Sequence, residues 1–438
     1  MRLLSKKHRL MVCGIMMALL LPASRSAIAA DPNTVAAWNK IAEDAVVNST
    51  NFQNEGLIYM AYISAAVYDA VVAIEGGYVP YRDGVSGRPG ASVDAAVIEA
   101  AYRTLAYYLP GQASFLDPRY TAALAAIADG QAKLDGIAVG EAASSLIIRL
   151  RMNDGRMALA STSDFPHLTP GPGVWRLTPP AYVAAQTPWV KDVTPFLIDV
   201  ADRFLPEPPP SLLSDEWTEA YNEIRTYGSG TSTARTSEQT DTARFWTAHV
   251  IRQYNLVLRD LIAMKGLSLL ESARLQAMVN MIGADAQIAV MYAKYHYLFW
   301  RPVTAIDPES VKPTGDPYGE PPPGFSDGNP ATDEETGWRP IATTPNHPEY
   351  PAAHGSITSA MAAVFREFLG TNRFDLPVHG FASLDAVRTF RTPAEMRNEI
   401  IDARVWAGFH YRVSGVQGVV LGRKVAKSAL RNAFGRID

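Results

Sequence analysis

The sequence predicts an all-α protein built from helical bundles. Over most of its 438 residues, apolar side chains recur at steps of three and four, the spacing that gives a helix one apolar face. Alanine, a strong helix former whose small side chain lets helices pack closely, is frequent in the same segments. Alternation of apolar and polar residues with a period of two, which would indicate strands, is scarce.

Two long segments without helical periodicity interrupt this pattern, from about Ser161 to Ser214 and from Pro302 to Pro351. The second is dense in Pro, Gly and Asp, and a long irregular loop inside a compact domain is usually functional or disordered. The periodic segments predict helices over Val35–Val47, Leu57–Ile74, Val93–Tyr108, Ile137–Met152, Thr242–Met264, Ser272–Phe299, Ile357–Leu369, Pro393–Trp406 and Val416–Phe434.

The first 29 residues are predicted to be a signal peptide. A basic start at Lys6, Lys7 and Arg9 precedes the apolar run Leu10–Leu21, and Ala27-Ile28-Ala29 offers the small residues of a cleavage site. We therefore expect a secreted or periplasmic protein.

After the signal peptide, we expect an N-terminal helical region over residues 30–230 and a C-terminal helical domain over residues 231–438. The net charge of −4 and the lack of a basic stripe with aromatic residues argue against a nucleic-acid partner. Cys13, the only cysteine, lies in the predicted signal peptide, so the mature chain has no disulfide and no cysteine-bound metal. No later run of eighteen apolar residues lacks a charge, so we expect no membrane span in the mature chain.

The most informative residues flank the second irregular segment. Lys294 and Arg301 are seven residues apart on a predicted helix, so both are expected to project from one face. His354 stands at the start of the next helix, where free backbone N–H groups favour an anion. Arg404 and His410 are six residues apart and can point to one place only if the helix breaks between them, most simply at Gly408.

Together these residues would place three cations and two imidazoles in one cluster, with no matching carboxylate. Such a cluster can be buried only around an anion, and arginine forks suit tetrahedral oxyanions. Each piece alone has a simpler interpretation: a Lys–Arg pair can be a solvated face, and His354 can be a helix cap or a packed side chain.

Other polar residues receive simpler interpretations. His296 is two residues from Lys294 and is expected to face elsewhere on the helix. Glu349 reads as a solvated loop carboxylate, with the orientation of a site residue as the alternative, and Asp402 is expected to pair with a cation. The sequence identifies no partner for three histidines: His167, His249 and His379.

The ordered motifs resemble those of the type 2 phosphatidic acid phosphatase and vanadium haloperoxidase superfamily. They read Lys294…Arg301-Pro302, Pro351-Ala352-Ala353-His354 and Arg404…His410, and the resemblance covers roughly residues 240 to 438. It implies helical bundles of the vanadium haloperoxidase type.

The resemblance also implies roles for these residues. Lys294, Arg301, Arg404 and the backbone N–H of Ala353 would bind the oxygens of vanadate or phosphate. His410 would be the ligand to vanadium in a haloperoxidase or the nucleophile in a phosphatase. The acid–base residue would be His354, and the loop from Pro302 to Pro351 would shape the substrate entrance.

Three positions bear on activity. The family has Pro-Ser-Gly-His in the second motif, so Ala352 removes a hydroxyl that donates to the anion, a bond worth roughly 1.5–3 kcal/mol. Ser414 stands where the family commonly has an aspartate that would orient a histidine. His347 stands where algal bromoperoxidases of the family carry a histidine, which favours bromide; otherwise it is a loop histidine near the entrance.

The leading hypothesis is a secreted vanadium-dependent haloperoxidase that binds vanadate and oxidises halide, bromide favoured, with hydrogen peroxide. The first alternative is a secreted acid phosphatase that forms a phosphohistidine at His410. The second is a degenerate oxyanion-binding protein, because of Ala352 and Ser414. The expected partners are small molecules (peroxide, halide or a phosphate ester), and the sequence leaves open a homodimer.

Overall fold

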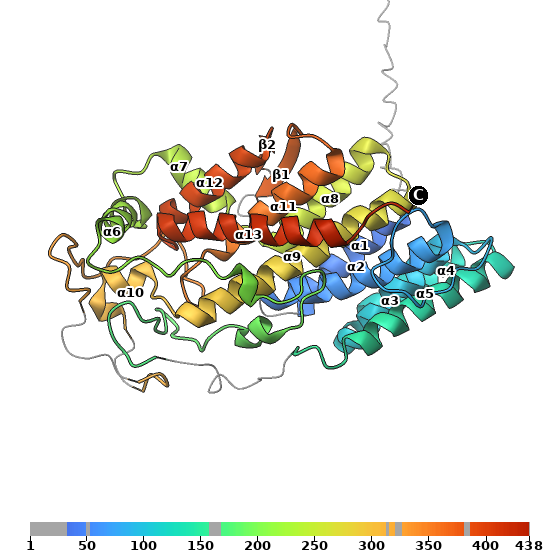
Figure 1. The fold of residues 1–438 in the computed structure, drawn as a ribbon, viewed down its shortest axis with the longest axis horizontal. Helices are drawn as coiled ribbons and strands as arrows, with labels where there is room; N and C mark the ends of the chain where they lie inside the picture. The colour runs from blue at the N-terminus through green and yellow to red at the C-terminus, as the bar shows by residue number, and fades with distance from the viewer. Residues whose placement is uncertain are drawn as a thin grey trace, which may run out of the picture. The chain divides into compact units, whose positions relative to one another are not determined.

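Helices make up most of the chain, which confirms the predicted fold class (Figure 1). The computed structural model describes residues 33–49, 53–156, 168–311, 315–319, 326–380 and 386–437, so the predicted signal peptide lies outside the described residues. The helices are α1 (Thr34–Ser49), α2 (Gln53–Glu75), α3 (Val93–Tyr108), α4 (Ala113–Ala125), α5 (Gln131–Leu150), α6 (Asp215–Gly228), α7 (Ser237–Phe245), α8 (Val250–Lys265), α9 (Leu269–Tyr297), α10 (Pro302–Ile306), α11 (Ala353–Leu369), α12 (Pro393–Trp406) and α13 (Arg412–Asn432).

Short elements complete the described fold. Strands β1 (Leu376–Gly380) and β2 (Ala386–Phe390) form an antiparallel pair in which Leu376 lies opposite Phe390. The 3-10 helices are η1 (Pro110–Gln112), η2 (Pro188–Asp192), η3 (Asp202–Phe204) and η4 (Pro308–Ser310).

The long helix α9 is the common support of the fold. It packs against α2 on one side and against α11 and α13 on another, so helices from both halves of the chain share one apolar core (Figure 1). Asn33–Asp438 form one compact unit, and the boundary expected at residue 230 stays a prediction. Helix α2 is long and apolar enough to cross a membrane, but 89% of its most apolar window is buried inside the protein, as in a core helix.

One predicted helix is in fact two. The segment Thr242–Met264 breaks after Phe245, and α8 begins at Val250. The side chain of Gln53 accepts a hydrogen bond from the Val250 N–H and so caps the new helix start. The break leaves the main-chain carbonyls of Trp246 and Ala248 free to accept hydrogen bonds from Arg404 and His354.

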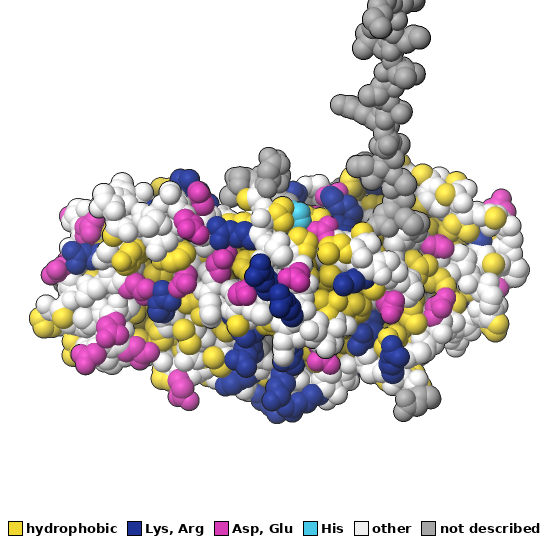
Figure 2. Space-filling view, turned by 90° about the horizontal axis from the view of Figure 1, so that it is seen from above, with side chains coloured by type: hydrophobic (Ala, Val, Ile, Leu, Met, Phe, Trp, Pro, Cys, Tyr) yellow, Lys and Arg dark blue, Asp and Glu magenta, His cyan; other side chains and the backbone are white. Residues whose placement is uncertain are grey.

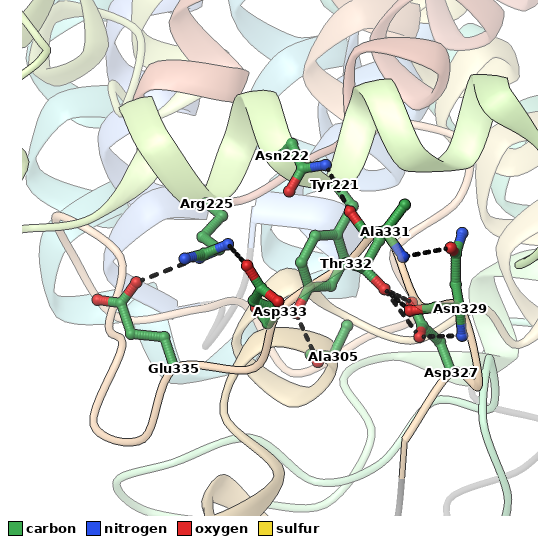
Figure 3. A network of polar contacts seen from close by, with 10 residues as sticks. All are labelled: Tyr221, Asn222, Arg225, Ala305, Asp327, Asn329, Ala331, Thr332, Asp333 and Glu335. Atoms are coloured by element: carbon green, nitrogen blue, oxygen red, sulfur yellow. Dashed lines mark hydrogen bonds and ion pairs between the residues drawn. The ribbon is translucent and has the colours of Figure 1, made fainter.

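The sequence analysis missed α6, which holds part of the second irregular segment in place. In Figure 3, Arg225 of α6 forms ion pairs with Asp333 and Glu335, and the amide of Asn222 donates to the Ala331 carbonyl. The hydroxyl of Tyr221 donates to the Asp333 carbonyl from the same helix face. This part of the loop is therefore ordered by α6.

Helices α11 and α13 touch through glycine. A Cβ at Gly422 would lie 2.0 Å from the Ser356 carbonyl oxygen, and one at Gly418 would lie 2.3 Å from that of Ala352. In addition, the Ala352 N–H donates to the Ser414 carbonyl at 3.0 Å. The start of α11 is thus held directly on the start of α13.

We expect Gly422→Ala to lower the free energy of unfolding by about 1–3 kcal/mol or more, as in overpacked cores. Alanine alone would favour the helix by about 1 kcal/mol, but the clash is with backbone that no side-chain rotation relieves. Urea denaturation measures the change. Gly111→Ala is the control, since a Cβ there meets nothing within 4 Å; equal stability of the two variants would contradict this packing.

Candidate oxyanion-binding site

The structure brings the three sequence motifs together at the ends of helices. Lys294 lies in the last turn of α9, and Arg301 is the N-cap residue of α10. His354 is the second residue of α11, and Arg404 lies in the last turn of α12. His410 lies in the turn between α12 and α13.

The expectation that Lys294 and Arg301 share a helix face is wrong. Helix α9 ends at Tyr297, and Leu298 takes a left-handed backbone conformation with φ of +49°. Arg301 is therefore in a new segment that turns back towards the site. The expected break between Arg404 and His410 is confirmed: Gly408 has φ of +77°, a conformation that favours glycine.

The three cations are buried in the protein. Lys294 and Arg301 are fully buried and Arg404 is 2% exposed, whereas other basic and acidic side chains are scattered over the surface drawn in Figure 2. The ammonium of Lys294 donates to the carbonyls of Pro348 and Glu349 at 2.8 and 2.7 Å.

Main-chain carbonyls also hold both arginines. Nε of Arg301 donates to the His347 carbonyl at 2.9 Å, and its Nη1 donates to the Phe409 carbonyl at 3.0 Å. Nη1 of Arg404 donates to the Trp246 carbonyl at 3.1 Å, which the break between α7 and α8 exposes. The dipoles of these main-chain carbonyls therefore stabilise the buried charges in place of water.

Glu349 supplies a carboxylate that the sequence analysis did not place in the cluster. Its interpretation as a solvated loop carboxylate is wrong, because the residue is fully buried. Oε1 accepts from Nδ1 of His410 at 2.8 Å and from the Tyr411 N–H at 3.1 Å. Oε2 accepts from the Ser414 hydroxyl at 2.5 Å. The alternative interpretation, that Glu349 orients a site residue, agrees with its contact to His410.

These contacts determine the tautomer of His410. Nη1 of Arg301 lies 3.2 Å from Nε2 of His410, and a guanidinium can only donate. Nε2 is therefore the unprotonated nitrogen, and the proton resides on Nδ1, where Glu349 accepts it. The ring presents a lone pair on Nε2, as a metal ligand or nucleophile requires.

An aromatic cluster holds the backbone beside these residues. Trp217 of α6 stacks on Trp300 with ring centroids 6.0 Å apart and lies 4.8 Å from the ring of Tyr411. Phe299 contacts the same Tyr411 ring and also Tyr350. Because Trp300, Tyr350 and Tyr411 directly adjoin Arg301, Glu349 and His410 in the chain, this packing fixes the position of the polar site.

Burial and mutual repulsion shift the pKa values of the cluster. Burial lowers the pKa of Arg404 to about 9 and that of Lys294 well below its usual value, and nearby Arg301 adds to both shifts. Burial lowers the pKa of Arg301 to about 10. Burial raises the pKa of Glu349 to about 7 against the opposing effect of Lys294. Every shift disfavours charge, so a bound anion would relieve the cations.

The environment of the two histidines of the motifs favours their neutral forms. Burial, followed by the neighbouring cations, lowers the pKa values of His354 and His410 well below 6.5. His354 also hydrogen-bonds the Ala248 carbonyl, a contact that opposes this shift. Since Nε2 of His354 has no partner among the described residues, Nδ1 makes that bond.

Unpartnered polar atoms surround a small inner pocket. His354, His410, Arg404 and Ala353 line a cavity of about 20 Å³, as does Gln287 of α9. Buried Nε2 of His354, Nε of Arg404 and Nε2 of Gln287 have no hydrogen-bond partner within the described part of the chain. Three of the buried polar atoms that lack a partner in the described part of the chain therefore belong to residues that line one pocket. Among the described residues, no group of three or more His, Cys, Asp or Glu is placed to hold a metal ion.

The C-terminal part of the chain matches a known family. Residues 274–438 match the family model of the VCPO second helical-bundle domain, which confirms the resemblance of the motifs. Over these residues the chain is therefore similar to the vanadium haloperoxidases. Among curated proteins, no sequence matches the chain.

Solved structures of vanadium haloperoxidases have the same fold as the chain. The chain is similar to a bacterial vanadium-dependent iodoperoxidase, with a TM-score of 0.74 and 20% identity over 93% of this chain and 98% of that one. It is similar to a bacterial vanadium-dependent chloroperoxidase in its apo form (TM-score 0.66, 17% identity, 86% and 92% covered) and holo form (0.67, 15%, 89% and 92%).

A larger outer cavity adjoins the inner pocket of this vanadium haloperoxidase fold. Its volume is about 340 Å³, and His347 lines both spaces. His347 is 6% exposed and its Nδ1 lies 3.0 Å from Nη2 of Arg301. His249, which the sequence left without a role, also lines the outer cavity.

The remaining polar residues lie apart from the site. His296 is exposed, as expected. His379 lies 2.9 Å from Asp260, and Asp402 pairs with Arg412 at 2.7 Å. His167 lies outside the described residues.

Acid should destabilise the protein through His249. Burial and nearby Arg252 lower the pKa of His249 from 6.5 to about 4. Between these values the unfolded chain binds a proton that the folded chain does not, so the stability present above pH 6.5 is lost as the pH falls towards 4. We expect the unfolding free energy of His249→Gln to fall by on the order of 2–3 kcal/mol less than that of the wild type over this pH range.

Urea denaturation at several pH values between 4.5 and 7.5 measures this effect. The control is the same substitution at exposed His296, which should leave the acid limb unchanged. A pH profile of His249→Gln that superimposes on the wild type would contradict the effect.

Proposed function

We propose that the chain is a vanadium-dependent haloperoxidase that oxidises halide, with bromide favoured, at the expense of hydrogen peroxide. The observation that carries the proposal is the excess of buried positive charge: Lys294, Arg301 and Arg404 face one carboxylate, Glu349. A buried excess of charge is costly unless an anion offsets it. We further expect export, as residues 1–29 indicate.

The side chains fit vanadate in charge and in donor type. Lys294, Arg301, Arg404 and the Ala353 N–H would hold its oxygens, and Nε2 of His410 would bind the vanadium. When bound, vanadate supplies a Lewis acid that activates peroxide. Because Nη1 of Arg301 lies 3.2 Å from Nε2 of His410, it must leave this nitrogen for vanadium to bind there. The inner pocket of about 20 Å³ has room for about one water, so its lining must also move to admit the anion.

His354 is suited to proton transfer beside this position. Its Nδ1 is held on the Ala248 carbonyl, and Nε2 is free to accept a proton in the pocket. A bound anion would offset the neighbouring cations and favour the protonated ring, so the proton taken up at Nε2 could then be donated. The preference for bromide rests on His347, which borders both cavities.

A phosphatase is the second candidate. Nε2 of His410 carries a lone pair, and Glu349 holds Nδ1–H, the arrangement that a nucleophilic histidine needs. The degenerate protein remains the third, because Ala352 lacks the hydroxyl and Ser414 the carboxylate of the resembling motifs. Glu349 weakens the objection raised by Ser414, since its carboxylate contacts both His410 and Ser414.

The candidates separate in two assays of the purified chain. We expect bromination of a phenol trap that requires vanadate, bromide and peroxide, and that falls at least about a hundredfold in His410→Ala, since even partners of metal ligands are worth 10- to 100-fold. His296→Ala, at an exposed position of α9, should retain full activity. Release of p-nitrophenol from its phosphate without bromination would instead indicate a phosphatase, and silence in both assays the degenerate protein.

A carboxylate at position 414 should be able to replace that of Glu349 in orienting His410. Glu349→Ala removes the acceptor for Nδ1–H, and we expect activity about 10- to 100-fold lower, as for other partners of metal ligands. In the wild type, the hydroxyl oxygen of Ser414 lies 2.5 Å from Oε2 of Glu349. Ser414→Asp alone would place a second carboxylate there, and repulsion between the two carboxylates should lower stability. The double variant Glu349→Ala/Ser414→Asp should recover activity relative to Glu349→Ala. A double variant no more active than the single one would rule out this role.

A further inference from the structure

We propose that Gln287 is an additional oxyanion ligand whose side-chain amide donates a hydrogen bond to a bound vanadate or phosphate. The inference rests on the proposed oxyanion function of the inner pocket. It adds a neutral donor to the charged residues that the motifs contain.

The position of Gln287 on α9 directs it to the pocket. It precedes Lys294 by seven residues, almost two helical turns, so both side chains lie on the same face of α9. Gln287 lines the inner pocket together with His354 and Arg404. The face of α9 that carries Lys294 therefore also carries Gln287, which reaches the inner pocket.

The amide of Gln287 lacks a hydrogen-bond partner. The residue is 2% exposed, and its Nε2 has no partner among the described residues. A buried donor without an acceptor costs free energy, and a native structure tolerates it where function supplies the acceptor. Nε of Arg404, also unpartnered, faces the same cavity and needs the same kind of partner.

Lys294 and Arg301 already donate to other groups, so the unpartnered donors of Gln287 and Arg404 are important for binding an anion. The Lys294 ammonium donates to two main-chain carbonyls, and Arg301 contacts carbonyls and imidazole nitrogens. An anion must compete with those acceptors for Lys294 and Arg301. Gln287 and Nε of Arg404 can donate to it without giving up a bond, and the neutral amide does so without adding to the repulsion among the cations.

Two substitutions test the proposal by calorimetric titration with orthovanadate and, separately, with inorganic phosphate at constant ionic strength. Gln287→Met keeps the length of the side chain without the donor, and we expect each anion to bind about 10- to 100-fold more weakly, the effect of one hydrogen bond to a charged group. Gln287→Glu places a negative charge in the pocket and should weaken binding further.

Gln276 provides the matched control on the same helix. It is 1% exposed, and its Nε2 donates to the Ser64 hydroxyl, away from the pocket residues. Gln276→Met should bind both anions as the wild type does, and circular dichroism checks that each variant is folded. If folded Gln287→Met and Gln287→Glu bind like the wild type, the role of Gln287 is overturned. If the wild type binds neither anion, the proposed oxyanion site fails and the inference fails with it.

Discussion

The burial of Lys294, Arg301 and Arg404 in one place is the constraint around which the rest of the site is built. Removing three cations from water is costly, and burial lowers the pKa of each. The segment 347–349 offsets part of this cost, because its three consecutive main-chain carbonyls accept hydrogen bonds from Arg301 and Lys294. The single carboxylate, Glu349, cannot neutralise three cations, so net positive charge remains to bind an anion.

The irregular parts of the fold serve this arrangement. The break between α7 and α8 presents the Trp246 carbonyl to Arg404 and the Ala248 carbonyl to His354. Trp217 of α6 packs beside the segments that carry the polar residues. Helix ends and loops, rather than helix interiors, therefore supply most of the site, and the long helices hold these ends in register.

Periodicity predicted the long helices well, because their apolar faces are needed for the core. The limits of α3 and α12 agree with the predicted ones, and α11 begins four residues earlier than predicted. Helix α6 and the break before α8 could not be read from local sequence. Trp217 is stabilised by residues far along the chain, and the gap is closed by side chains such as Gln53.

The motifs identified five charged or protonatable residues, yet not Glu349, which holds His410, or Gln287, which lines the inner pocket. Glu349 looks like a loop residue in the sequence, since its burial depends on His410 and Ser414 more than sixty residues away. Gln287 carried a local signal, the seven-residue spacing to Lys294, but an uncharged amide on a buried helix is not distinctive until its partners are known.

A crystal structure of the chain grown with orthovanadate tests the central claim most directly. We expect one vanadate in the inner pocket, where Nε2 of His410 would be its ligand and Lys294, Arg301 and Arg404 would contact its oxygens. A structure in which these side chains keep their contacts to the carbonyls of segment 347–349 and the pocket contains no anion at millimolar vanadate would contradict it.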